Sequence, residues 1–350
     1  MPAMTSQSAA FRAVLLALLA GAAATVTACG GNQDPMAPST ADPIAETAAD
    51  VPAVSSAAPE LLTAGSGPRI LFSSARTGGF DIYRMAPDGS GVVRITSFTG
   101  ADIMPAWSWN NARIAMVRDR ADLTNGPHKD IYLMNADGTG KKWARPTTTQ
   151  WDITDPSWSK DGSRLVVSVW IGASRGSIGV PYLALLTVAN GNITLLTTGL
   201  TAHVGFSPSF DPTGKKVVYS GQNAATLEII NADGTGHTTI IDGQPRGDGL
   251  SWGNIVYPVF SPDGKRIAFA MSTVGNWDIY VLTVADGTVK RLTTNAAEDT
   301  HPTWSADGTR IAFTSSRSGK NQVWTMPSNG GTQVRVTNTS VTENSPAWSH

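Results

Sequence analysis

The sequence contains a single cysteine, Cys29, in 350 residues. One thiol cannot form an internal disulfide, and it excludes any metal site built from several cysteines. Charge is also scarce, because charged side chains make up 15% of the chain and the formal net charge is -1. A nucleic-acid-binding protein needs a concentrated basic surface, so this balance argues against one. The chain also has no long block of like charge that would suggest a polybasic membrane patch.

Glycine, proline and tryptophan are abundant instead, with 35, 21 and 11 copies. Glycine and proline punctuate chains that turn often, and aromatic residues favour β-strands. This composition predicts many short strands joined by tight turns and does not fit a helical protein.

The first 28 residues have the features of a targeting segment. Arg12 is the only charge before the apolar run 13–19, and the small residues that follow make the segment too short and too alanine-rich for a membrane span. It ends in Val-Thr-Ala-Cys at 26–29, which resembles the lipobox of bacterial lipoproteins. The resemblance implies that residues 1–28 are a lipoprotein signal peptide and that Cys29 carries the lipid. The alternative is ordinary signal-peptide cleavage beside an incidental cysteine.

Residues 29–67 consist mostly of Ala, Pro, Ser, Thr, Asp and Gly. Such a segment has too few large apolar side chains to offset the entropy of ordering, so we expect a disordered tether.

Internal repeats predict the fold of the remaining residues, 68–350. A Pro-x-aromatic step recurs six times at spacings of 51, 52, 50, 44 and 44 residues, and most copies precede a Ser-x-Asp-Gly turn and a basic, β-rich run. Four short strands per repeat are typical of a propeller blade. The repeated prolines are Pro105, Pro156, Pro208, Pro258, Pro302 and Pro346.

The two ends of this region complete each other. Residues 69–72 match a second strand without a first, and residues 345–349 match a first strand without a second. We therefore predict an all-β, six-bladed β-propeller whose C-terminal strand closes the first blade, because closure removes open sheet edges. The aromatic residue after each proline should lie between blades. Trp151, Trp170, Trp252 and Trp277 fall outside this register and are better candidates for the surface, although packing is the commoner role.

The repeats Trp-Ser-x-Asp-Gly-x-Arg-Ile-Ala-Phe, Asp-Ile-Tyr-x-Met/Leu and Arg-Ile/Leu-Thr resemble the WD-like repeats of the TolB family, and the resemblance covers about Pro68 to His350. It implies a periplasmic propeller that binds partner proteins and catalyses nothing. Two departures limit the comparison: the sequence has no room for the N-terminal domain of TolB, and it carries the lipobox-like segment.

Polar residues lie before or at the start of each predicted first strand. First strands are innermost in a propeller, so these loops should share one mouth of the channel and form a negative funnel for a cation or a basic peptide. Two histidines in blades two apart would allow a shared metal site. The alternative is that these loops are simply solvated or that the aspartates cap turns, and we predict no metal or cofactor. The candidate ligand-binding residues are Asp102, Asp152, Asp155, His203, Glu298, Asp299, His301 and Glu343.

The expected function is therefore a non-catalytic, lipid-anchored binding protein of the bacterial cell envelope. Its partner would be an envelope protein or a peptidoglycan-associated molecule, and the propeller would act as a monomer. One alternative is an extracellular glycan lyase or hydrolase that uses channel-mouth histidines and carboxylates, with or without a metal. Another is a small-ligand sensor or scaffold. An enzyme should show two titratable groups within hydrogen-bond reach in a closed pocket.

Overall fold

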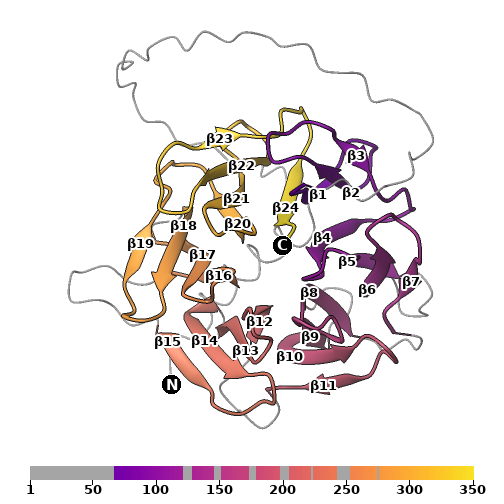
Figure 1. Cartoon of the computed structure of the whole chain (residues 1–350), viewed down its shortest axis with the longest axis vertical. Helices are drawn as coiled ribbons and strands as arrows, with labels where there is room; N and C mark the ends of the chain where they lie inside the picture. The colour runs from indigo at the N-terminus through magenta and orange to yellow at the C-terminus, as the bar shows by residue number, and fades with distance from the viewer. Residues whose placement is uncertain are drawn as a thin grey trace, which may run out of the picture. The chain divides into compact units, whose positions relative to one another are not determined.

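The computed structural model describes residues 67–120, 128–145, 151–172, 179–197, 205–221, 224–242, 253–273 and 276–350. These residues form twenty-four strands in six four-stranded antiparallel sheets, which are arranged around one axis (Figure 1). The predicted six-bladed propeller is thus confirmed. No helix among these residues is long and apolar enough to cross a membrane.

The strands of each blade run outward from the axis in the same order. The six first strands are β4 (Asp102–Trp107), β8 (Asp152–Trp158), β12 (Gly205–Phe210), β16 (Ile255–Phe260), β20 (Asp299–Trp304) and β24 (Glu343–Trp348). The second strands are β1 (Ile70–Ser74), β5 (Arg113–Arg120), β9 (Arg164–Ile171), β13 (Lys216–Gly221), β17 (Arg266–Ser272) and β21 (Arg310–Ser315).

The two outer positions hold the third strands and the shorter fourth strands. The third strands are β2 (Asp81–Met85), β6 (His128–Asn135), β10 (Val180–Thr187), β14 (Thr226–Asn231), β18 (Trp277–Thr283) and β22 (Gln322–Pro327). The fourth strands are β3 (Val93–Arg94), β7 (Lys142–Trp143), β11 (Ile193–Leu195), β15 (Thr238–Ile241), β19 (Val289–Arg291) and β23 (Val334–Arg335).

The ring closes by pairing the last strand with the first. β24 is antiparallel to β1, with Trp348 opposite Ile70 and Glu343 opposite Ser74. One blade therefore contains both ends of the propeller, as the sequence predicted.

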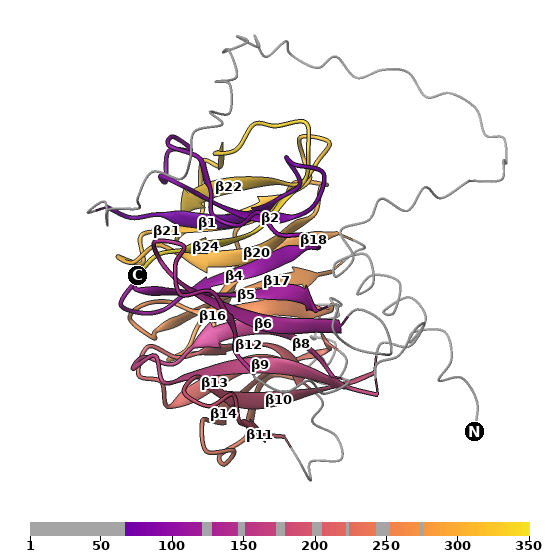
Figure 2. The same ribbon diagram turned by 90° about the vertical axis from the view of Figure 1, so that its right-hand side faces the viewer.

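The meander gives the propeller two different ends. The turns between first and second strands and between third and fourth strands lie together at one end, which we call the turn end. Backbone hydrogen bonds join the two kinds of turn, as from Ala232 to Lys215 and from Val284 to Lys265. The C-terminus also lies at the turn end, which faces the viewer in Figure 1 and lies at the left in Figure 2. We call the opposite end the loop end.

The Ser-x-Asp-Gly turns are built by their own side chains. In the blade of β8 the hydroxyl of Ser159 accepts a hydrogen bond from the amide of Arg164 at 3.0 Å and donates one to Asp161 at 2.7 Å. Gly162 has a φ of 68°, which glycine adopts without strain. These local contacts explain why the repeat signal is visible in the sequence.

The aromatic residues of the repeat pack between blades, as predicted. Trp158 is 2% exposed and its indole donates to the Ala106 carbonyl of the preceding blade. The guanidinium carbon of Arg113 lies 4.6 Å from the Trp158 ring centre, and the same group donates a hydrogen bond to the Gly162 carbonyl. One arginine therefore contacts the next blade at two points. The other buried aromatic residues at this position are Trp107, Phe210, Phe260, Trp304 and Trp348.

Two of the four off-register tryptophans pack in the interior, which was the commoner of the two expected roles. Trp170 and Trp277 are buried, and the indole of Trp170 donates to the Thr154 hydroxyl at 3.1 Å. Both residues lie on regular strands whose two faces pack against other blades. Trp151 is half-buried, and Trp252 lies outside the described residues.

Candidate functional site: an axial cavity

A β-bulge interrupts the pairing of first and second strands at the same place in all six blades. The residue before the repeated proline lies in this bulge and has a φ between 51° and 54°, a left-handed conformation that is uncommon outside glycine. A bulge redirects the side chain at its centre, and these six side chains form a ring that lines the central cavity. The ring consists of Met104, Asp155, Ser207, Tyr257, His301 and Ser345.

The cavity has a volume of about 200 Å³. Its walls are the six repeated prolines and the aromatic residues that follow them, so most of its lining is apolar. Trp109, Pro262 and His350 also line it, and these residues belong to the turn end. The cavity therefore extends from the ring toward the turn end.

Asp155 is one of three titratable residues in the ring. Its carboxylate accepts a hydrogen bond from Thr154 at 2.7 Å. Burial raises the pKa of Asp155, and hydrogen bonds from Ser168 and from the Ser207 backbone offset part of this effect. These contacts tie Asp155 to its own blade and to the next one.

Tyr257 and His301 form a stacked pair in the ring, with ring centres 3.7 Å apart. Nδ1 of His301 lies 3.0 Å from the Thr300 hydroxyl. Burial lowers the pKa of His301 to about 3, so its imidazole is neutral at physiological pH. Burial raises the pKa of Tyr257, and the charge of Asp155 raises it further.

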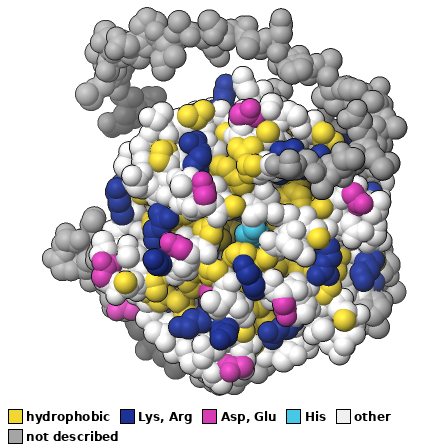
Figure 3. All heavy atoms as spheres, viewed as in Figure 1, with side chains coloured by type: hydrophobic (Ala, Val, Ile, Leu, Met, Phe, Trp, Pro, Cys, Tyr) yellow, Lys and Arg dark blue, Asp and Glu magenta, His cyan; other side chains and the backbone are white. Residues whose placement is uncertain are grey.

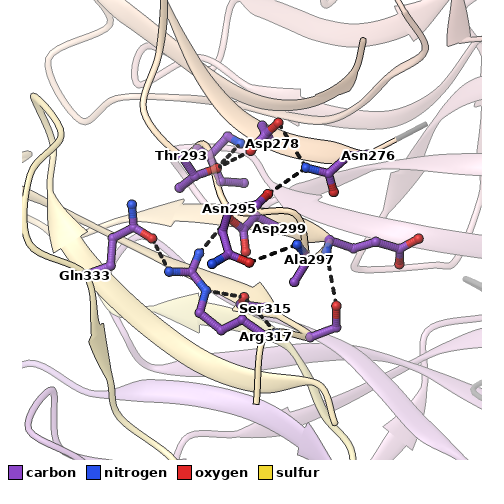
Figure 4. Close-up of polar contacts among 12 residues, drawn as sticks. Asn276, Asp278, Thr293, Asn295, Ala297, Asp299, Ser315, Arg317 and Gln333 are labelled. Carbon is purple, nitrogen blue, oxygen red and sulfur yellow. Dashed lines mark hydrogen bonds and ion pairs between the residues drawn. The ribbon is translucent and has the colours of Figure 1, made fainter. Parts of the chain in front are cut away.

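Three of the predicted acids are buried beside arginines at the loop end. Asp299 pairs with Arg317 at 2.7 Å, and Glu343 pairs with Arg76 at 2.7 Å. Figure 4 shows how Arg317 also donates to Ser315 while Asp299 lies near Asp278 of the preceding blade. These carboxylates bind their own chain and do not line the cavity.

Asp102 occupies the matching position in its blade but is bound less well. Its side chain is fully buried, Arg118 lies 3.7 Å away, and neither carboxylate oxygen has a hydrogen-bond partner among the described residues. Burial raises the pKa of Asp102 to about 6, and the nearby Thr96 side chain and the attraction of Arg118 offset only part of that rise. Arg118 itself lies over the Phe98 ring, 3.5 Å from its centre.

The remaining predicted residues are dispersed. Asp152 is half-buried and accepts a hydrogen bond from the Lys129 amide at 2.8 Å, whereas Glu298 is exposed. His203 lies outside the described residues. Of the eight predicted residues, Asp155 and His301 line the cavity; a binding role for the others at the loop end stays a prediction.

Four members of the ring were not among the predicted residues: Met104, Ser207, Tyr257 and Ser345. Their shared signal was the position directly before each repeated proline. Among the described residues, no three His, Cys, Asp or Glu side chains are grouped closely enough to hold a metal ion.

Six sheets around one axis and a cavity along that axis define a six-bladed propeller with a central pocket. The chain belongs to the TolB beta propeller domain family, which matches residues 54–256 and 244–350. A stretch of 148 residues is 28% identical to an uncharacterized protein of Agrobacterium fabrum, and it covers 41% of this chain and 45% of that protein. The chain thus matches about half the length of this curated relative.

Solved structures show the same fold at low sequence identity. TolB from Acinetobacter baumannii is 16% identical with a TM-score of 0.64, over 80% of this chain and 66% of that one. An oligogalacturonate lyase in complex with manganese is 16% identical with a TM-score of 0.51, over 78% of this chain and 74% of that one. The fold is therefore common to a TolB protein and to an enzyme.

Proposed function

We propose that this protein is a non-catalytic binding protein of the bacterial cell envelope, which recognises an envelope protein or a peptidoglycan-associated partner through the axial cavity. In this proposal the chain is exported and is held at a membrane by a lipid on Cys29. The rigid blades hold the lining residues in a fixed array, which suits recognition of one shape.

The proposal rests on the protonation and hydrogen bonding of the titratable side chains that line the cavity. A general base is effective when its pKa lies near the working pH, and a pKa of about 3 makes His301 a poor base. Asp155 and His301 are hydrogen-bonded to the hydroxyls of Thr154 and Thr300, their own neighbours, rather than to each other. Because these polar side chains are already hydrogen-bonded and the walls are apolar, the cavity is suited to receiving an apolar side chain of a partner.

A variant that fills the cavity tests this role. Ser345→Tyr places a tyrosine in a bulge whose φ of 51° nearly equals the 54° of Tyr257, so the backbone already accommodates that residue type in this conformation. We expect the variant to keep the thermal unfolding temperature of the wild type but to lose its crosslinked partner in envelope extracts. Ser318→Tyr, at an exposed position of the loop end, is the matched control and should keep the partner. An unchanged set of crosslinked proteins for Ser345→Tyr would refute recognition through the cavity.

The enzyme alternative makes a different prediction for the same cavity. If Asp155 and His301 acted on a glycan, purified protein would release new reducing ends or unsaturated products from envelope polysaccharide or oligogalacturonate, and His301→Ala would abolish that release. We expect no product from either protein, with or without added manganese. Turnover that depends on His301 would replace the binding proposal with a catalytic one.

A further inference from the structure

The turn end of the propeller concentrates positive charge around the opening of the cavity. Five of the six second strands begin with a basic residue, Arg69 directly precedes the sixth, and three further lysines lie in the preceding turns. The turn segments that surround the axis hold nine cationic side chains and four carboxylates, so their net charge is about +5, and Figure 3 shows Lys and Arg side chains spread over this face. The nine are Arg69, Arg113, Lys160, Arg164, Lys215, Lys216, Lys265, Arg266 and Arg310.

Arginines and lysines of this set have different environments. Arg113 and Arg266 each lie over a tryptophan ring of the next blade and donate to a turn carbonyl there, so their guanidinium groups stabilise the ring of blades. The lysines, in contrast, are exposed and belong to no ion pair among the described residues. We call Lys160, Lys215, Lys216 and Lys265 the mouth lysines.

The mouth lysines lie on turns that pack against one another beside the cavity. Gly214 lies against Lys160 of the preceding blade, and Gly264 lies against Pro212 in the same way. Nζ of Lys160 is 4.2 Å from the ring centre of Trp109, which lines the cavity. Lys265 belongs to the same turn as Pro262, another lining residue.

The carboxylates of these turns are bound within the turns. Asp263 accepts hydrogen bonds from the Ser261 hydroxyl and the Lys265 amide, and Asp211 accepts them from the amides of Lys215 and Lys216. Hydrogen bonds of this kind lower the pKa of Asp263, so its charge persists but its oxygens are engaged. A ligand at this surface therefore meets the lysine ammonium groups first.

We propose that the partner presents an acidic peptide segment, whose carboxylates contact the mouth lysines while one apolar or aromatic side chain enters the axial cavity. This proposal rests on the binding function proposed above and adds the chemistry of the partner. The binding surface in this proposal is positively charged. The sequence pattern had instead predicted a negatively charged funnel for a cation or a basic peptide.

The test uses the purified protein with Cys29→Ser and a fluorescent peptide that carries glutamates on both sides of one tryptophan. We expect anisotropy to show binding that weakens as salt rises, because exposed charges are screened. Each of Lys160→Glu and Lys265→Glu should weaken binding by about two- to five-fold, the range measured for exposed ion pairs. Lys320→Glu, an exposed lysine at the loop end, is the matched control and should leave binding unchanged.

Altered peptides and lipid vesicles distinguish between the possible ligands of this surface. A peptide with lysines in place of the glutamates should not bind, and replacing its tryptophan with glycine should remove the effect of Ser345→Tyr. Equal binding of the basic and acidic peptides, or no response to Lys160→Glu and Lys265→Glu, would overturn the proposal. Binding to phosphatidylglycerol vesicles in preference to the peptide would assign the mouth lysines to a lipid surface and would also overturn it.

Peptide binding and partner capture can fail independently. If the acidic peptide binds but Ser345→Tyr still captures the wild-type envelope partner, the cavity is not where that partner docks, and the proposed function fails. If partner capture depends on the cavity but the peptide result is negative, only the acidic chemistry is wrong.

Discussion

Asp102→Asn should stabilise the propeller at neutral pH, although it removes one member of an ion pair. Asp102 is fully buried, 3.7 Å from Arg118, and without a hydrogen-bond partner among the described residues. Its pKa rises from 3.8 to about 6. At 1.36 kcal/mol for each unit, ionising this carboxyl in the folded state costs about 3 kcal/mol.

The sign of the pH dependence follows from that rise. Below pH 3.8 the carboxyl is protonated in both the folded and the unfolded protein, and it contributes no penalty. Between pH 3.8 and about 6 the unfolded state is ionised while the folded state keeps its proton, so the wild type loses stability over this interval and the loss is complete above about pH 6. The substituted asparagine would stay neutral throughout, and Asp102→Asn should therefore gain up to about 3 kcal/mol at pH 7.5 but only about 1 kcal/mol at pH 4.5.

Urea denaturation at pH 4.5 and pH 7.5 measures the difference, and Asp299→Asn is the matched comparison. Asp299 has the same position in its strand but pairs with Arg317 at 2.7 Å. Removing one partner of a buried pair leaves an uncompensated charge, which typically costs about 3–5 kcal/mol. The two substitutions should have opposite signs at pH 7.5. If Asp102→Asn destabilises the protein at that pH, the reasoning from burial is refuted.

Three further variants test other parts of the protein. Cys29→Ser should release the protein from membranes into the soluble fraction, as immunoblots of fractionated cells will show; retention would contradict the lipid anchor. Deleting residues 343–350 removes β24 and the buried Trp348, so circular dichroism should show no cooperative unfolding transition, whereas a retained transition would mean that β1 can remain an open edge. Arg266→Ala removes the hydrogen bond to Gly308 and the contact with Trp304, and should cost about 2 kcal/mol in urea denaturation. Lys216→Ala, an exposed residue at the same strand position, should change stability little.

The fold was predictable because the blade signals are local. Ser159, Asp161 and Gly162 form their turn through contacts with each other, so the same letters recur wherever that turn recurs. Strand closure followed from counting which strand was missing at each end. The aromatic residue after the repeated proline could be assigned to the space between blades because it recurs in all six copies.

The ring of the cavity could not be predicted in the same way. A residue before proline normally adopts an extended conformation, and nothing in the letters before Pro258 indicates a φ of 54° at Tyr257. The bulge is visible only in the pairing of first and second strands, where it recurs in all six blades. Asp155 and His301 could therefore be predicted as site residues from their chemistry. Tyr257, which lies between them in chain order, could not.

The sequence also did not reveal how closely each arginine would approach its buried aspartate. Asp102 and Asp299 begin equivalent strands, yet Arg118 lies directly opposite Asp102 in the strand pairing, whereas Ser315 lies opposite Asp299 and Arg317 is two residues farther on. An arginine directly opposite an aspartate extends its long side chain alongside that aspartate. An arginine beyond the end of the strand can fold its side chain back over the aspartate. Two residues of register thus separate a 3.7 Å contact from a 2.7 Å ion pair.

The charge at the mouth of the cavity follows from the direction of the first strands. Acids precede these strands and cations follow the turns after them, so the turns around the axis hold nine cationic side chains against four aspartates, although the net charge of the chain is -1. The acids at the loop end, such as Asp299 and Glu343, are then neutralised by half-buried arginines, whereas the mouth lysines remain exposed. A partner therefore meets the cations of the turn end more directly than the acids of the loop end. Net charge cannot reveal this arrangement, because it adds buried, paired carboxylates and exposed, unpaired lysines with equal weight.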